Sequence, residues 1–259
     1  MHGAGNDFVV VPDAPPASGR DAALVRALAD RRRGVGADGV LFLERVEEPG
    51  IDFRMHFYNC DGGRAGLCLN GARCAALRSV QLGWSGPELS LLTEYTTVQA
   101  TVDGERVRLS LPLPDREVRE VDLPEGSPAT RGWAVHTGDP HLVLELDDLE
   151  AGSFEERARA LRWWTGPDPA GSNVHFVDRS GEDWEIRSFE RGIEGETLAC
   201  GSGCVSALLA LRGAEPGSRA ALRTRTGDVI EVRVDGPNLV LEGPAVCVFT
   251  TDWSGDGSE

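Results

Sequence analysis

The chain has 259 residues, 41% of them hydrophobic and 26% charged, which is typical of a soluble globular protein of one or two domains. Its formal net charge of −16 argues against a nucleic acid or an anionic membrane as a partner, because neither would find a basic surface. All 26 basic residues are arginine. The absence of lysine excludes an enzyme that holds PLP through a lysine and an ordinary P-loop NTPase.

The sequence also excludes several locations and cofactors. No apolar run approaches the roughly 20 residues of a membrane span. The N-terminal segment has no apolar core of the signal-peptide type, so we expect a cytoplasmic protein. The six cysteines should then be mostly reduced. The spacing of cysteines and histidines matches no zinc motif, so we expect neither a metal nor another cofactor.

The first half of the chain predicts an alternation of strands and helices. Apolar runs and turn residues predict a strand at 8–11, a helix at 21–33, strands at 40–46 and 51–58, a helix at 70–82, and strands at 88–102 and 106–111. Pro112 and Pro114 then interrupt the pattern.

The second half repeats this plan. It predicts strands at 133–137 and 141–146, a helix at 154–164, strands at 174–177 and 184–189, a helix at 201–213, strands at 221–224, 229–234 and 239–241, and a disordered tail at 254–259. The repetition predicts two similar domains, at 1–112 and 113–243.

The second helix of each half follows a cysteine in a glycine-rich turn, Cys68 in one half and Cys200 in the other. Backbone N–H groups and the helix dipole favour negative charge there, which predicts a lowered thiol pKa. Apolar residues cover much of both helices, so we expect them to be buried and their N-termini to meet at a cleft between the domains. Two facing thiols can remove a proton from one side of a carbon and return one to the other, which is the chemistry of a racemase or epimerase.

At these residues the chain resembles diaminopimelate epimerase, a cofactor-independent enzyme family, nearly from end to end. The similar segments are residues 1–8, 34–39, 59–62, 190–203 and 243–246. The resemblance implies an α+β fold of two similar domains, each a central helix enclosed by a curved mixed β-sheet, with the active site in the interdomain cleft. It also implies that the last strand, at about 244–253, returns to the N-terminal domain.

The resemblance assigns a role to each matching residue. Cys68 and Cys200 are implied to be the acid and base, and the N–H groups of the residues after them to hold the substrate α-carboxylate. The implied substrate-binding residues are Asn6, Asn59, Leu69, Asn70, Asp139, Asn173, Glu190, Arg191, Gly201 and Ser202. Arg191 would bind the distal carboxylate as a fork. Asn59 and Glu190 would accept hydrogen bonds from the distal ammonium group.

Simpler structural roles remain open for some of these residues. Glu190 and Arg191 also fit a surface ion pair, and the asparagines also fit turns. His141 fits either the cleft or the core. The remaining cysteines, at 60, 74, 204 and 247, are expected to be small buried apolar residues.

Three features depart from the family pattern. Leu69 stands where the family usually has glycine, and Asp139 where it has asparagine close to the distal carboxylate. The segment 193–195 is one residue longer than the commonest form. Ser202 in place of threonine is a minor change. An acid at position 139 is expected to stay neutral beside Arg191, to form an ion pair with it, or to favour a cationic or neutral distal group.

The predicted function is therefore the interconversion of L,L- and meso-diaminopimelate, in lysine and cell-wall biosynthesis. A racemase or epimerase of another amino acid on the same scaffold is the first alternative, for which Leu69 and Asp139 are the evidence. A binding protein that has lost turnover is a second alternative, and a structural zinc protein is the weakest. The expected partner is a small amino-acid substrate, and a homodimer stays open.

Overall fold

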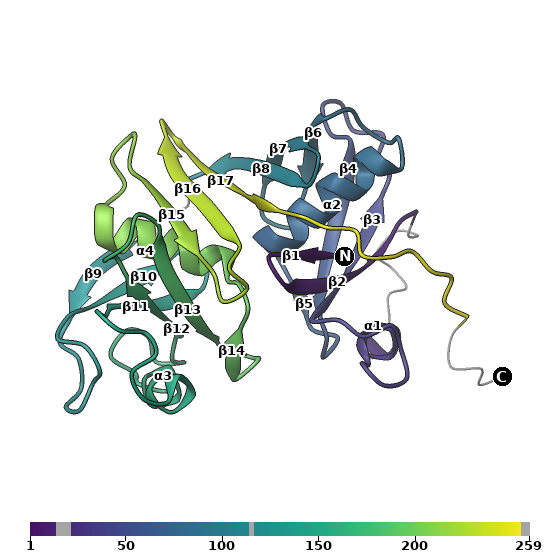
Figure 1. Cartoon of the computed structure of the whole chain (residues 1–259). Coiled ribbons are helices and arrows are strands. Elements are labelled where there is room, and N and C mark those ends of the chain that lie inside the picture. The colour runs from purple at the N-terminus through teal and green to yellow at the C-terminus, as the bar shows by residue number, and fades with distance from the viewer. Residues whose placement is uncertain (14–21, 114–116, 255–259) are drawn as a thin grey trace. The chain divides into compact units, whose positions relative to one another are not determined.

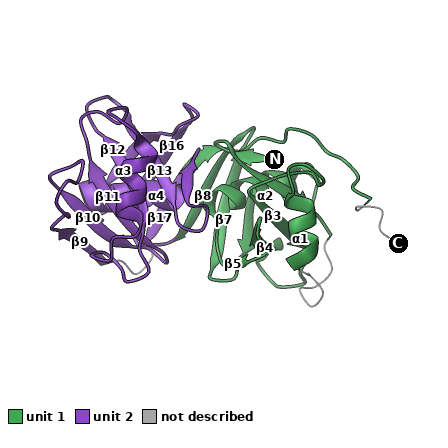
Figure 2. Ribbon diagram, turned by 90° about the horizontal axis from the view of Figure 1, so that it is seen from below, with its two compact units in different colours: residues 1–111, 242–259 green, residues 112–241 purple. Residues whose placement is uncertain are grey.

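The computed structural model describes residues 1–13, 22–113 and 117–254. The chain divides into two compact units (Figure 2): unit 1 comprises Met1–Leu111 with Glu242–Glu259, and unit 2 comprises Pro112–Leu241. The start of the helix predicted at Asp21 and nearly all of the tail predicted at 254–259 lie outside the described residues.

The described residues of unit 1 form helices and the strands of a mixed sheet (Figure 1). Its elements are β1 (His2–Gly3), β2 (Asn6–Val11), α1 (Ala22–Ala29), β3 (Gly39–Glu44), β4 (Phe53–Asn59), β5 (Arg64–Ala65), α2 (Leu69–Gln81), β6 (Glu88–Leu92), β7 (Thr97–Asp103) and β8 (Arg106–Pro112). Strand β2 pairs antiparallel with β1 and parallel with β3. Strand β4 pairs antiparallel with β3 and β5 and parallel with β6. Antiparallel pairs then join β6, β7 and β8.

Unit 2 repeats this connectivity. Its elements are β9 (Glu117–Val121), β10 (Gly132–His136), β11 (Pro140–Glu145), α3 (Phe154–Arg162), β12 (Asn173–Asp178), β13 (Trp184–Glu190), β14 (Gly195–Thr197), α4 (Gly201–Arg212), β15 (Arg219–Arg223), β16 (Val229–Asp235) and β17 (Asn238–Pro244). Strand β11 is antiparallel to β10 and parallel to β12, and β13 is antiparallel to β12 and β14 and parallel to β15. The last residues of β17 belong to unit 1.

The pairing pattern of β1 to β7 is therefore that of β10 to β16, which confirms the predicted repeat and the α+β fold class. Parallel neighbours need a crossover, and a helix supplies each one: α1 and α3 in the first crossover of each unit, α2 and α4 in the second. Most residues of α2 and α4 are buried, as their apolar surfaces predict.

The structure differs from the predicted elements in several ways. The helix predicted at 21–33 ends at Ala29. The last strand, predicted at about 244–253, is not formed: β17 ends at Pro244, and beyond it Val246 makes an isolated bridge with His2. The strand predicted at 88–102 is broken into β6 and β7 by a turn in which the Thr93 hydroxyl accepts a hydrogen bond from the Thr96 N–H at 3.1 Å. Strands β1, β5, β9 and β14 were not predicted, because β1, β5 and β14 have two or three residues and β9 is mostly exposed, so none shows an apolar period.

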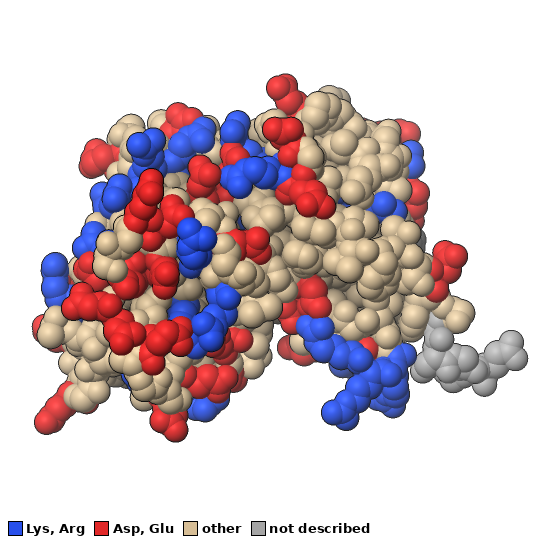
Figure 3. All heavy atoms as spheres, in the orientation of Figure 1, with Lys and Arg blue, Asp and Glu red and all other residues tan. Residues whose placement is uncertain are grey.

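Arginine and acidic side chains are interspersed over the surface that Figure 3 shows. Exposed pairs such as Arg131 with Glu120, at 2.9 Å, are screened by solvent and add little to stability. Over the described part of the chain, we find no helix with the length and apolar character that crossing a membrane requires.

Candidate active site

Unit 1 brings its predicted site residues to one edge of its sheet. Asn6 begins β2 and Asn59 ends β4. Gly39, the first residue of β3, pairs with Phe8 of β2 and with Asn59 of β4. Because β3 is parallel to β2 and antiparallel to β4, the start of β2 and the end of β4 share an edge. The Cys68 thiol lies at this edge, with its Sγ 4.0 Å from Oδ1 of Asn6.

Cys68 is the N-cap of α2, as predicted, with an extended backbone (φ −129°, ψ 114°). Its Sγ accepts a hydrogen bond from the Gly71 N–H at 3.4 Å, and its carbonyl accepts one from Ala72 at 2.8 Å. The N–H groups of Leu69 and Asn70 belong to the first turn, where a helix offers donors to an anion. The Leu69 side chain is buried.

A polar network fixes the Asn6 side chain. Its Oδ1 accepts from the Asn70 amide at 3.2 Å, and its Nδ2 donates to Asp38 at 2.9 Å. Arg31 in turn donates to Asp38 at 2.7 Å and to both carboxylate oxygens of Asp7 at 2.8 Å. Burial acts to raise the pKa of Asp7, but the hydrogen bonds and charge of Arg31 outweigh it and lower that pKa. The sequence did not predict this network, although the segment 34–39, which contains Asp38, is one of those that resemble the family.

Arg73 holds Asn70 from the other side. Its side chain is fully buried, and it donates to Oδ1 of Asn70 at 3.0 Å and to the carbonyl of Pro244 at 3.1 Å. Backbone hydrogen bonds at 2.9 Å join His2 and Val246 in both directions. The final segment thus packs against β1 and α2 within unit 1. An arginine among the apolar residues of a predicted buried helix indicates a buried polar contact, and this signal was not used in the sequence analysis.

Unit 2 places its residues at the corresponding edge. Asn173 begins β12 and Glu190 ends β13. Asn173 pairs with His141 of β11, and the next register pair joins Val174 with Phe189. Cys200 is the N-cap of α4, with φ −122° and ψ 107°. Cys200 therefore occupies in unit 2 the position that Cys68 occupies in unit 1.

The predicted lowering of the thiol pKa is wrong for Cys200. Burial raises the pKa of Cys200 well above that of a free thiol, and the negative charge of Glu190 raises it further. The Ser202 hydroxyl, 3.5 Å from Sγ, and the Gly203 N–H lower the pKa but are outweighed. Desolvation thus outweighs the hydrogen-bond donors at the start of α4, and the Cys200 thiol is a weaker acid than a free thiol.

Hydrogen bonds fix the site residues at the sheet edge of unit 2. The Thr197 hydroxyl donates a short hydrogen bond to Glu190, across the β13–β14 hairpin. The Asn173 side chain accepts from the Arg191 N–H at 2.8 Å and donates to the Pro140 carbonyl at 3.3 Å. Asn173 thus shapes the backbone beside the cysteine, which is the turn role left open for the asparagines.

Arg191 forms an ion pair with Asp139 at 2.9 Å. The two side chains are 32% and 65% exposed, so the pair is reachable from solvent. This is one of the three outcomes expected for an acid at position 139. The guanidinium that the resemblance assigns to a distal carboxylate has a carboxylate of this chain beside it.

Two buried histidines lie beneath the start of α4. Nδ1 of His141 is 2.8 Å from Nε2 of His175, whose Nδ1 is 2.9 Å from the Ser188 hydroxyl. A Cβ at Gly203 would lie 2.4 Å from the His175 ring, so glycine is required for this contact. Burial lowers the pKa of His175 to about 3 and that of His141 well below its usual value, so both rings are neutral.

The other cysteines do not all match their prediction. Cys74 and Cys204 are buried as expected, and burial raises the pKa of Cys74 to about 12. Cys60 is exposed and Cys247 half-buried, because neither lies on an inward-facing position of a helix or strand.

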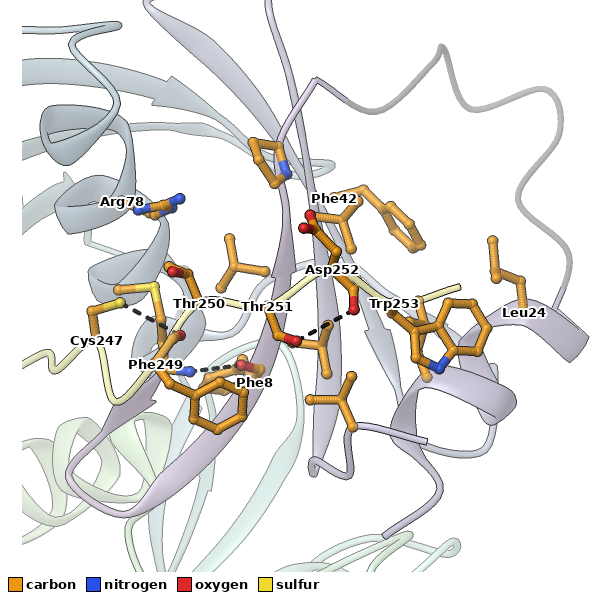
Figure 4. A pocket seen from close by; sticks show the side chains of 17 residues that line it. Phe8, Leu24, Phe42, Arg78, Cys247, Phe249, Thr250, Thr251, Asp252 and Trp253 are labelled. Atoms are coloured by element: carbon orange, nitrogen blue, oxygen red, sulfur yellow. Dashed lines mark hydrogen bonds between the residues drawn. The ribbon is translucent and has the colours of Figure 1, made fainter. Parts of the chain in front are cut away.

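A cavity of about 650 Å³ lies in unit 1 between β2 and the segment 247–253 (Figure 4). Apolar side chains such as Phe8, Phe42 and Trp253 dominate its lining, which includes neither Cys68 nor Asn6. The cavity is thus separate from the candidate site. Among the residues described, no three histidine, cysteine or acidic side chains are grouped to hold a metal ion.

Solved structures of related architecture define the class of the fold. A probable proline racemase from Agrobacterium radiobacter superposes with a TM-score of 0.70 at 17% identity, over 96% of this chain and 92% of that one. A hydroxyproline epimerase from Agrobacterium vitis gives a TM-score of 0.68 at 18% identity, over 94% and 86%. The chain therefore has the doubled α+β fold that these two structures share.

Sequence comparison identifies the family. The family model described as diaminopimelate epimerase matches residues 1–109 and 133–248. A diaminopimelate epimerase of Gemmatimonas aurantiaca is 36% identical over 268 residues, covering 99% of this chain and 94% of that relative. One of Aquifex aeolicus is 32% identical, covering 96% and 94%. The chain belongs to the diaminopimelate epimerase family and is a PLP-independent isomerase.

Proposed function

We propose that this protein interconverts L,L- and meso-diaminopimelate, with Cys68 and Cys200 acting on opposite faces of one α-carbon. The observation that carries the proposal is that both cysteines cap the second helix of a repeated unit, each at the sheet edge that holds the other predicted site residues. The names of the relatives support this choice of substrate.

In the proposed mechanism each thiol serves as base in one direction and as acid in the other. Cys200, whose pKa is raised by burial and by Glu190, is the proton donor of the resting enzyme. Cys68 then accepts the α-proton as a thiolate, with its Sγ already beside the Gly71 N–H. Negative charge that develops on the substrate α-carboxylate is stabilised by N–H groups at the starts of α2 and α4.

The distal end of the substrate is proposed to bind the side chains at the two sheet edges. Arg191 would face the distal carboxylate, and Asn59 and Glu190 the distal ammonium. Asn6 is held in place for this role by Asn70 and Asp38. We also propose that the enzyme works in the cytoplasm. A homodimer remains a prediction, which sedimentation of the purified protein would measure.

Solvent-isotope exchange tests the proposal directly. We expect the purified enzyme, in D₂O without PLP, to replace the α-hydrogen of diaminopimelate with deuterium and to form the second stereoisomer. Proton NMR follows the first event and chiral chromatography the second. An enzyme that exchanges no α-hydrogen in any of a panel of amino acids would be a binding protein, and the proposal would be wrong.

A racemase or epimerase of another amino acid is the second candidate, and the ion pair between Asp139 and Arg191 is the observation that favours it. With Asp139 and Glu190 both ionised, the three side chains carry a net charge of −1. The distal end of diaminopimelate is a neutral zwitterion, whereas that of a basic amino acid is a cation. A cation is therefore the better electrostatic match.

Asp139→Asn separates the two candidates. If diaminopimelate is the substrate, removing the acid frees Arg191, and KM for diaminopimelate should fall severalfold while kcat changes little, since the pair is exposed and screened. If a basic amino acid is the substrate, KM for it should rise by a similar factor. Steady-state kinetics on diaminopimelate, lysine and ornithine measure both. Unchanged kinetics on all three would show that Asp139 does not set specificity.

A further inference from the structure

Glu194 stands out in the loop that follows β13 and carries Arg191. It has a positive φ of 57°, which a residue other than glycine seldom adopts. Its N–H donates to the Glu190 carbonyl at 2.8 Å and closes the turn. A backbone conformation of this kind persists only where surrounding contacts hold it. The loop is also the segment that is one residue longer than the commonest family form.

Arg162, the last residue of α3, supplies those contacts. Its side chain is 4% exposed, and its Nε and Nη2 donate to Oε1 of Glu194 at 3.1 and 2.8 Å. The Gly192 N–H donates to the same oxygen at 3.0 Å. A guanidinium buried to this degree needs an anionic partner, so Glu194 and Arg162 require each other.

The same arginine also holds the loop that leads into β12. Its Nη1 donates to the Ala170 carbonyl at 3.1 Å, and its own carbonyl accepts from the Ser172 N–H at 3.1 Å. The next residue, Asn173, accepts from the Arg191 N–H at 2.8 Å. Arg162 therefore connects the two loops whose ends carry Asn173 and Arg191, and Glu194 is its link to the second of them.

We propose that Glu194 is a positioning residue, whose bond to Arg162 holds Arg191 at the place where the distal carboxylate of the substrate binds. The inference rests on the proposed function of Arg191. Glu194 acts through the backbone of residues 191–194, and the two cysteines keep their places on α2 and α4 without it. Loss of Glu194 should therefore weaken substrate binding and leave the proton transfers largely unchanged.

Kinetics of two substitutions test the proposal. For Glu194→Ala we expect KM for diaminopimelate to rise roughly 10- to 100-fold, with kcat within about threefold, since misplacement by 1 Å has effects of this size. Glu194→Gln keeps an oxygen that accepts from Arg162 and should restore most of the affinity. Glu155→Ala is the matched control. Glu155 pairs with Arg159 at 3.0 Å on the exposed face of α3, the helix that ends at Arg162. An unchanged KM in Glu194→Ala would overturn the proposal.

Hydrogen exchange gives a readout that does not need turnover. The amides of residues 191–195 should exchange faster in Glu194→Ala than in the wild type, and at the wild-type rate in Glu155→Ala. Amides in β12 and α4 should keep their protection in both variants, which shows that unit 2 remains folded. Wild type that turns over no diaminopimelate would contradict the proposed function alone. Loop exchange unaffected by Glu194→Ala would contradict the positioning role whatever the substrate.

Discussion

Replacing either Cys68 or Cys200 by alanine should reduce epimerisation of diaminopimelate roughly 10²- to 10⁴-fold, the contribution of one general acid or base. The physical reason is stereochemical as well as catalytic. Each thiol serves one face of the α-carbon, so inversion fails when either is missing. The measurement is the rate at which one stereoisomer forms the other, followed by chiral chromatography.

The single variants should still catalyse exchange of the α-hydrogen, which an unfolded protein cannot do. With one thiol left, a proton can still be removed and returned on the same face. Cys200→Ala should therefore exchange the α-hydrogen of only one stereoisomer with D₂O, without inversion, and Cys68→Ala that of the other. If both variants exchanged the same stereoisomer, the two-sided mechanism would be wrong.

Cys247→Ala is the matched control for these variants. Cys247 is a half-buried thiol of unit 1 that caps no helix. Its Sγ donates a weak hydrogen bond to the Phe249 carbonyl at 3.8 Å. We expect this variant to epimerise at the wild-type rate. A similar loss in Cys247→Ala would show that alanine at any cysteine disturbs the fold.

Acidification from pH 8 to pH 5 should destabilise unit 2 through its buried histidines. His175 has a pKa of about 3 in the folded state and about 6.5 when unfolded, because burial penalises the charged ring. Between these two pKa values the unfolded chain therefore binds a proton that the folded chain does not bind. This stability is fully present above pH 6.5 and is lost as the pH falls toward 3. At pH 5 the loss is about 2 kcal/mol for His175, and His141 adds a loss in the same direction.

Urea unfolding at several pH values measures this effect, with the tryptophans of unit 2 as reporters. In His175→Gln the decrease in unfolding free energy between pH 8 and pH 5 should be about 2 kcal/mol smaller than in the wild type. The comparison uses the pH dependence, so a change in absolute stability does not obscure it. If His175→Gln left the pH dependence unchanged, His175 would not be a buried neutral ring.

Sequence reasoning located the strands, the helices and the two cysteines because each of these depends on local pattern. Apolar periodicity marked both buried helices, and the glycine-rich turn before each marked its start within one residue. The repeat was visible for the same reason, since each half carries its own copy of the pattern. The failures were also local in origin: β1, β5 and β14 are too short to show a period.

The charge states and partners of the site residues required the tertiary structure. The start of α4 predicted an acidic thiol, but burial and Glu190 raise the pKa of Cys200. In the sequence, Glu194 has the pattern of a surface loop residue. Only the folded chain brings Arg162, 32 residues earlier, within hydrogen-bond distance of its carboxylate. Asp139 and Arg191 lie 52 residues apart and become an ion pair only in the folded chain.

The sequence by itself therefore determined the class of fold, the family and the two candidate catalytic thiols of this protein. The tertiary structure decided which side chains hold those of Asn6 and Arg191, and that the pKa of the Cys200 thiol is raised. The reason is that a pKa depends on solvent exclusion and on charges brought close by folding, and neither is a property of neighbouring residues along the chain.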